Sequence, residues 1–198
     1  LHGVQHSFPT RRSSDLKPLQ ALPFVAAGGP RRLGLSAAQV AVVCASHSGE
    51  AKHQAAVADL LARAGCRVDE LRCGAHVPGV YALLDEAPPP PPYSPLAHNC
   101  SGKHAGMLAL CALSGWPREG YLEPGHPLQA AIRAAIAGHA GVRAGDLVPA
   151  IDGCSAPNYA LPLSGLARAY ARIARADDGG SDAAARRTIF DAMSAHPD

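Results

Sequence analysis

The sequence is poor in aromatic residues, has no marked excess of charge of either sign and lacks any long apolar run. With 3 Phe, 5 Tyr and 1 Trp in 198 residues, a core must be built mainly from Ala, Leu, Val and Ile. Lys and Arg number 18 against 16 Asp and Glu, which gives no electrostatic reason to expect binding to nucleic acid or to an anionic membrane surface. No apolar run reaches the roughly 18 residues of a membrane-spanning helix, and no basic segment followed by an apolar one indicates a signal peptide.

Hydrophobic residues, at 47%, are still frequent enough for a well-packed core, and the length allows one domain or at most two. The chain has six cysteines, namely Cys44, Cys66, Cys73, Cys100, Cys111 and Cys154. An even number could form disulfides, but nothing indicates secretion and a chain of this length does not need them. We therefore interpret them as thiols of a cytoplasmic protein, some of them metal ligands. The Ala, Arg, Gly and Pro bias is typical of a GC-rich bacterium.

Residues 1–16 differ in composition from the rest of the chain. The string HSFPTRRSSDL, residues 6–16, is polar, whereas the chain from Lys17 onward is rich in Ala, Leu and Gly. This string resembles an in-frame translation of a widely used sequencing adapter, so we interpret residues 1–16 as a non-native segment before a partial domain over residues 17–198. The alternative is a divergent N-terminal arm. Because the chain starts with Leu rather than Met and ends abruptly, we expect it to be incomplete at both ends.

The pattern of apolar and turn-forming residues predicts mostly helices with a few strands, and therefore an α/β or α+β domain. Ser36 and Ser101 are typical N-caps, and Gly65 is placed to end the helix before it. We expect helices over residues 18–26, 37–45, 57–64, 102–113, 128–136, 163–173 and 182–196, a buried strand over 147–151, and a surface loop at Pro88–Pro92.

Three polar turns lie between apolar elements: ASHSGE (45–50), HNCSGKH (98–104) and DGCSAPN (152–158). Catalytic and binding groups favour such positions. Each turn places Ser, Cys, His, Lys or Asp beside Gly, which lets a ligand approach the backbone. His47 and His104, which share these turns with the cysteines, are candidate ligands or acid–base groups, and the alternative is an ordinary hydrogen-bonding role for each.

The turn HNCSGKH is the most informative of the three. Cys100 precedes the expected helix start, and Lys103 lies in the first helical turn, where its charge opposes the helix dipole. A helix N-terminus and a nearby ammonium group both favour a thiolate. Together with Cys154 this gives two thiols and a lysine, and thiolates are good zinc ligands. From the pattern alone, a capped helix with a surface lysine and two incidental cysteines is favoured over a metal site.

Ser14 and Lys17 form an S-x-x-K motif. On a helix this spacing places both side chains on one face, where the lysine can accept the serine proton. The motif is common by chance, and Ser14 lies in the segment that we interpret as non-native.

The strings KPLQALPFV, CASHSGE, HNCSGKHAGML and DGCSAPNYALPL, taken together, resemble the Rhizobium-etli-type L-asparaginase family, also called asparaginase II. The resemblance runs from Lys17 to about Ile173. It implies a fold similar to serine β-lactamases and glutaminases, with an α/β/α arrangement around an antiparallel sheet. The activity it implies is hydrolysis of the side-chain amide of L-asparagine to L-aspartate and ammonia by a Ser-Lys mechanism near a zinc site.

The resemblance also implies roles for individual residues. The family's zinc ligands match Cys100, Lys103 and Cys154, with a water or the substrate completing the site. His104 and Asp152 match positions that resemble substrate-binding groups.

Two Ser-Lys pairs are implied as well. Ser14 and Lys17 match the first pair, although Ser13 stands where the family has Arg. Ser46 matches the serine of the second pair, with Ser48 as the alternative. The lysine of that pair is expected beyond the end of this chain, so we expect this chain by itself to be inactive.

The implied partner is a small-molecule substrate, with a homodimer as the expected assembly and neither nucleic acid nor a membrane as a partner. Two alternatives to an asparaginase stay open. One is a related serine amidohydrolase such as a glutaminase, and the other is a non-catalytic binding module stabilised by zinc.

Overall fold

The computed structural model describes residues 13–175 and 179–197. The α-helices are α1 (Lys17–Ala26), α2 (Gly29–Leu33), α3 (Ala37–Cys44), α4 (Ala51–Arg63), α5 (Gly79–Leu84), α6 (Ser101–Ser114), α7 (Pro127–Ala140), α8 (Leu163–Ala174) and α9 (Ala183–Ala195). Short 3₁₀ helices are η1 (Ser13–Leu16), η2 (Val68–Glu70), η3 (Pro95–Ala97) and η4 (Ala144–Asp146). Strands β1 (Val148–Ile151) and β2 (Pro157–Ala160) pair antiparallel, with Val148 opposite Ala160.

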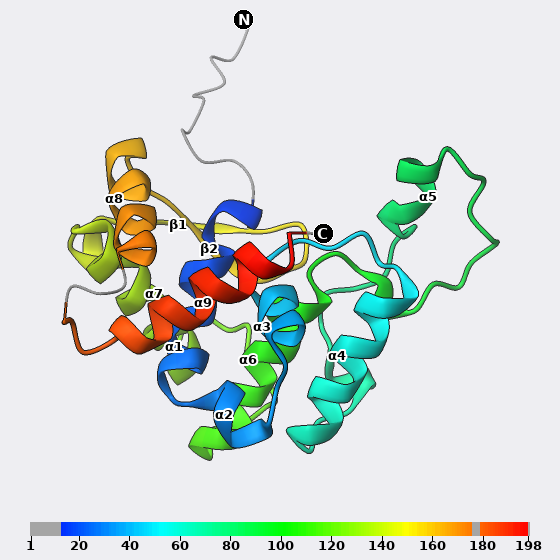
Figure 1. The fold of residues 1–198 in the computed structure, drawn as a ribbon, viewed down its shortest axis with the longest axis horizontal. Coiled ribbons are helices and arrows are strands. Elements are labelled where there is room, and N and C mark those ends of the chain that lie inside the picture. Colours follow the sequence, from blue (N-terminus) through cyan, green and yellow to red (C-terminus); the bar gives the residue numbers. More distant parts are fainter. Residues whose placement is uncertain (1–12, 176–178, 198) are drawn as a thin grey trace, which may run out of the picture.

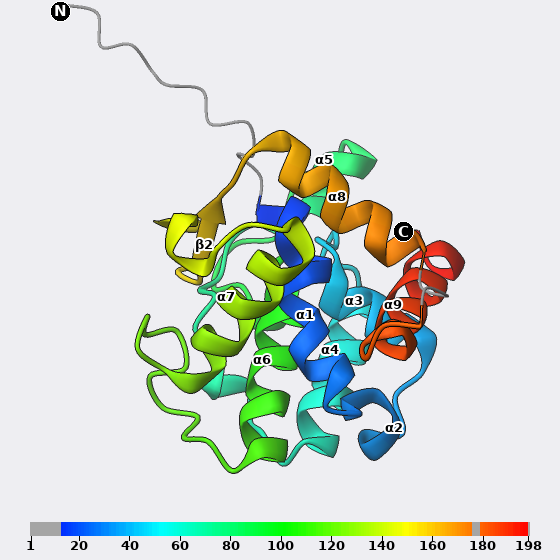
Figure 2. The same cartoon turned by 90° about the vertical axis from the view of Figure 1, so that its left-hand side faces the viewer.

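Helix α1 lies at the centre of the molecule and contacts α3, α6, α7 and α9 (Figure 2). Pro18 occupies its first turn, where no helical N–H bond is lost. Its apolar side chains Leu19, Leu22 and Phe24 are buried. The first residue of α1, Lys17, is buried as well, so the most central helix begins with a charged side chain inside the core.

Helix α6 packs unusually close to α3, and two glycines make this approach possible. A Cβ atom added at Gly102 would lie 2.1 Å from the carbonyl oxygen of Val42, and one at Gly106 would lie 2.5 Å from a methyl group of Val43. The close packing brings the start of α6 against the end of α3. Two of the three polar turns therefore meet at this place.

Several predictions from the sequence are confirmed. The α/β class is confirmed by a body of helices with a small antiparallel sheet, which in the described residues has two strands. β1 lies within the strand expected over residues 147–151, and Ser36 caps α3 in a capping box with Gln39. The expectation that this strand is buried is wrong, because all four residues of β1 are exposed on an edge strand of the two-stranded sheet in the described residues. Pro88–Pro92 are exposed in the loop after α5, which projects from the body (Figure 1). None of the helices in the described ranges is long and apolar enough to cross a membrane.

The expected N-cap at Ser101 is wrong. Helix α6 begins at Ser101 itself, and Cys100 occupies the capping position. The Ser101 hydroxyl donates instead to the carbonyl oxygen of Leu96 at 2.8 Å, so it is not available to cap the helix. The correction moves the thiol of Cys100 closer to the helix N-terminus than expected. The interpretation of residues 1–16 as non-native concerns mainly residues 1–12, which lie outside the described residues.

We predict that Gly102→Ala destabilises the protein by about 3 kcal/mol, because the new methyl group meets a backbone carbonyl that cannot rotate away. The matched control is Gly138→Ala in α7, where the space is open. That change should stabilise the helix by about 0.5–1 kcal/mol. Urea unfolding of both variants measures the difference, and equal free energies of unfolding would contradict this account of the α3–α6 contact.

Candidate active site

The three polar turns converge on one region of the fold. ASHSGE follows α3, HNCSGKH forms the start of α6, and DGCSAPN is the turn between β1 and β2. The N-terminal end of α1 supplies a fourth component, Lys17. Four segments far apart in the sequence thus bring a serine, two cysteines and two lysines close together.

The amino group of Lys17 contacts both of the first two turns. Its Nζ atom lies 2.8 Å from Ser46 Oγ, 3.0 Å from the carbonyl oxygen of Ala45 and 3.0 Å from that of Asn99. Lys17 has no exposed surface, whereas Ser46 is exposed. The hydroxyl of Ser46 therefore connects a buried amine to the surface, where a substrate could reach it.

Burial lowers the pKa of Lys17, because an ammonium group loses its hydration in the core. The neighbouring Cys100 acts in the opposite direction and Lys103 acts in the same direction, and the net pKa is below the ordinary value. The amine can therefore lose its proton more easily than an exposed lysine.

Hydrogen bonds of the neighbouring His47 hold the turn that contains Ser46 in place. The N–H of Gly49 donates to His47 Nδ1 at 3.1 Å, so the ring proton is on Nε2, which lies 2.9 Å from Ser101 Oγ. Burial, with help from nearby cationic groups, lowers the pKa of His47 to about 3, so the ring stays neutral. Gly49 has φ +80° and lies against the carbonyl of Ala97, a position that excludes other residues. His47 thus supports the turn and is not placed to ligate a metal.

The neighbouring Ser48 makes a different contact. Its hydroxyl donates to Glu50 Oε1 at 2.7 Å. Lys17 hydrogen-bonds Ser46, although the family resemblance places these two residues in different Ser-Lys pairs. Ser14 lies in η1 directly before α1, and its side chain lies outside the described part of the structure.

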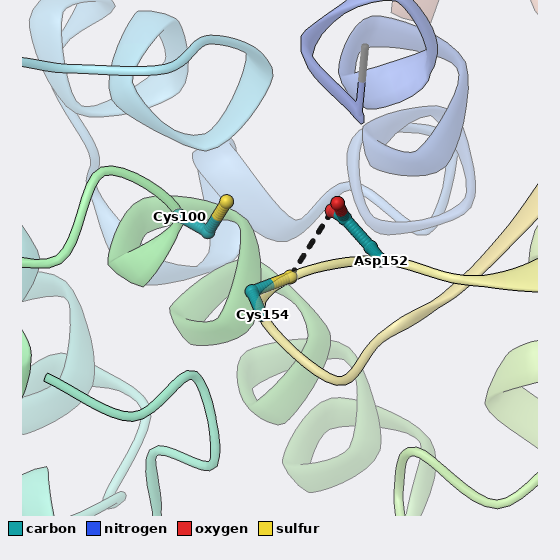
Figure 3. A group of neighbouring side chains, drawn as sticks. All are labelled: Cys100, Asp152 and Cys154. Carbon is teal, nitrogen blue, oxygen red and sulfur yellow. Dashed lines mark hydrogen bonds between the residues drawn. The ribbon is translucent and has the colours of Figure 1, made fainter. Parts of the chain in front are cut away.

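Cys100, Asp152 and Cys154 form a group whose potential ligand atoms all lie within 4.8 Å of one another (Figure 3). Cys154 Sγ donates to Asp152 Oδ2 at 3.2 Å, and Lys103 Nζ donates to the same oxygen at 3.0 Å. Cys100, Lys103 and Cys154 are nearly inaccessible to solvent. The described residues therefore include a buried Cys/Asp/Cys group with the chemistry to hold a metal ion, and Lys103 adjoins it.

The two thiols of this group have very different acidities. The neighbouring thiol of Cys154, opposed by burial and aided by Lys17 and Lys103, lowers the pKa of Cys100 to about 6. The proximity of Cys100, together with burial, raises the pKa of Cys154 to about 12. Burial lowers the pKa of Lys103, but both cysteines and Asp152 outweigh it, and the net pKa is raised. Without a metal, a Cys100 thiolate and an Asp152 carboxylate thus face the ammonium group of Lys103.

His104 follows Lys103 on α6 and is fully buried. Its Nδ1 atom lies 2.7 Å from the hydroxyl of Tyr121, and its Nε2 atom has no hydrogen-bond partner among the described residues. Sequence reasoning missed Tyr121 because it lies in a loop without a motif. It also missed Asn99, which contributes through a backbone oxygen that any residue would supply.

The remaining candidates have structural roles. His98 Nδ1 accepts the N–H of Cys100 at 3.0 Å, and its ring lies 4.2 Å from that of His76. Cys44 and Cys111 are completely buried and belong to the core.

Comparison with known proteins agrees with the resemblance seen in the sequence. The family model described as L-asparaginase II matches residues 3–198, which is nearly the whole chain. No curated protein matches the chain. The chain therefore belongs to the L-asparaginase II family, which supports an amidohydrolase at the level of the family.

Proposed function

We propose that this member of the L-asparaginase II family hydrolyses the side-chain amide of L-asparagine through a serine activated by Lys17. The observation that carries the proposal is the contact between the buried amine of Lys17 and the exposed hydroxyl of Ser46. Family membership supports amide hydrolysis as the reaction and a small molecule as the substrate.

The geometry around Lys17 suits proton transfer. A neutral amine has two N–H donors and one lone pair, and these match the carbonyls of Ala45 and Asn99 and the hydroxyl of Ser46. A charged ammonium has three donors and matches the same three oxygens. Lys17 can therefore gain or lose a proton without moving, which a general base and acid requires.

In the proposed reaction, Ser46 Oγ forms a bond to the side-chain carbonyl carbon of asparagine while its proton passes to Lys17. The resulting tetrahedral intermediate collapses when Lys17 returns the proton to the amide nitrogen, and ammonia leaves. A water molecule then attacks the acyl-enzyme ester, with Lys17 again accepting a proton. Aspartate is released and Ser46 recovers its hydrogen. Ser14 stays the second candidate nucleophile because of its S-x-x-K spacing to Lys17.

We further propose that the group beside this pair holds zinc through Cys100, Lys103 and Cys154. The donors fit, because two thiolates and an amine are good ligands for this ion and their turns lie together. Lys103 and Cys154 must each lose a proton to ligate it. Asp152, which accepts hydrogen bonds from both, would then either stay beside the ligands or join them. When bound, zinc would supply positive charge that orients the substrate.

His104 and Asp152 complete the proposed site as groups that bind the substrate. Asp152 belongs to the candidate metal group and offers carboxylate oxygens to an amino acid, and His104 directly follows Lys103 on α6. All six cysteines are free and buried, which supports a reducing, cytoplasmic location.

We predict that Ser46→Ala and Lys17→Met each lower kcat for L-asparagine by about 10²–10⁴-fold, because each removes one partner of the proton transfer. Ser48→Ala is the matched control and should keep most of the activity, since its hydroxyl contacts Glu50. Ammonia release should be assayed with the natural open reading frame that contains this chain, with L-asparagine and L-glutamine in parallel. Full activity of Ser46→Ala would overturn the role of Ser46, and turnover of glutamine alone would overturn the substrate.

We also predict that the same protein binds zinc and that Cys100→Ala, Lys103→Met and Cys154→Ala each weaken binding. Loss of a ligand should cost more than the about 10–100-fold typical of a supporting residue. Cys66→Ala, which removes a buried thiol outside the group, is the control. Zinc content after dialysis and competition with a chelator measure the affinity. Unchanged affinity in Cys100→Ala would show that the metal, if bound, lies elsewhere.

A further inference from the structure

The hydroxyl of Tyr121 is buried between the loop that follows α6 and the backbone near residue 72. The tyrosine is 1% exposed, and its oxygen accepts the backbone N–H of Arg72 at 3.0 Å. The same oxygen lies 2.7 Å from His104 Nδ1. This short contact joins a residue outside the three polar turns to one inside them.

Counting protons settles the direction of the contact between Tyr121 and His104. Tyr121 has one O–H to donate, and burial raises its pKa, so it keeps that proton. The Arg72 N–H is a donor and cannot accept it. Among the described residues, His104 Nδ1 is the acceptor that the structure provides. Tyr121 therefore donates to Nδ1, and a ring nitrogen that accepts carries no hydrogen, so the ring hydrogen of His104 is on Nε2.

The Nε2 atom of His104 is the ring nitrogen that Tyr121 does not contact. It is buried and has no hydrogen-bond partner within the described ranges. Cys154 is nonetheless close enough to act on the pKa of His104. A buried N–H without a hydrogen-bond acceptor destabilises the fold, so we expect Nε2 to donate to an acceptor in the proposed active site.

We propose that Tyr121 is a positioning residue that holds His104 in the tautomer with hydrogen on Nε2, so that this N–H is available as a hydrogen-bond donor to the sulfur of Cys154. A hydrogen bond of this kind stabilises a thiolate ligand and orients it. The tautomer follows from the contacts of Tyr121 alone, whereas the consequence for metal binding rests on the proposed zinc site.

Nitrogen-15 NMR of the histidine rings tests the tautomer directly in the metal-free protein. His104 should show a protonated Nε2 and an unprotonated Nδ1, and its signals are identified by their loss in His104→Gln. In Tyr121→Phe, Nδ1 loses its donor and the ring should shift toward the other tautomer or a mixture. The control Tyr159→Phe removes another buried hydroxyl and should leave the signals unchanged. A protonated Nδ1 in the wild-type protein overturns the proposal even if no variant folds.

Zinc affinity provides the second readout. Tyr121→Phe should weaken zinc binding about 10–100-fold, as expected for a residue that supports a ligand, and Tyr159→Phe should not. If the tautomer changes but zinc affinity does not, the link from His104 to Cys154 is wrong. If the wild-type protein has the expected tautomer but binds no zinc, the proposed metal site fails while the positioning of His104 stands.

Discussion

The burial of the Lys17 amino group is the constraint on which the fold and the site both depend. Fully buried lysines are rare, yet two of the three lysines in this chain are buried, and Lys17 begins the central helix. Its burial is tolerable because Ala45, Ser46 and Asn99 accept its hydrogen bonds. Those partners belong to two separate turns, so the burial of Lys17 depends on the positions of both turns.

The buried charges around Cys100, Asp152 and Cys154 also depend on one another. The ammonium of Lys103 pairs with Asp152, and the depressed pKa of Cys100 supplies a thiolate between the two lysines. The ammonium of Lys103 is thus compensated by anions from the start of α6 and from the β1–β2 turn. Zinc binding through Lys103 and Cys154, as proposed above, would require both groups to lose a proton and would change this balance.

The sequence was sufficient to find the three polar turns, because breaks in an apolar pattern and the family resemblance both mark them. The contact between Lys17 and Ser46 was not predicted, since S-x-x-K spacing describes neighbours on one helix and these residues are 29 positions apart. Ser101 was expected to cap α6, but its hydroxyl is used by Leu96. Tyr121 carries no local signal at all, because its importance comes from a tertiary contact with His104.

The buried amine of Lys17 must be able to act as a base, and titration of this amine is the direct test. The chain has three lysines, so NMR of lysine labelled at the ε-carbon gives few signals, and Lys17→Arg identifies the one that matters. We predict that Lys17 titrates below the ordinary lysine pKa of 10.5 in the folded protein. A pKa at or above that value would mean that Lys17 stays charged and is not the base that accepts the proton of Ser46.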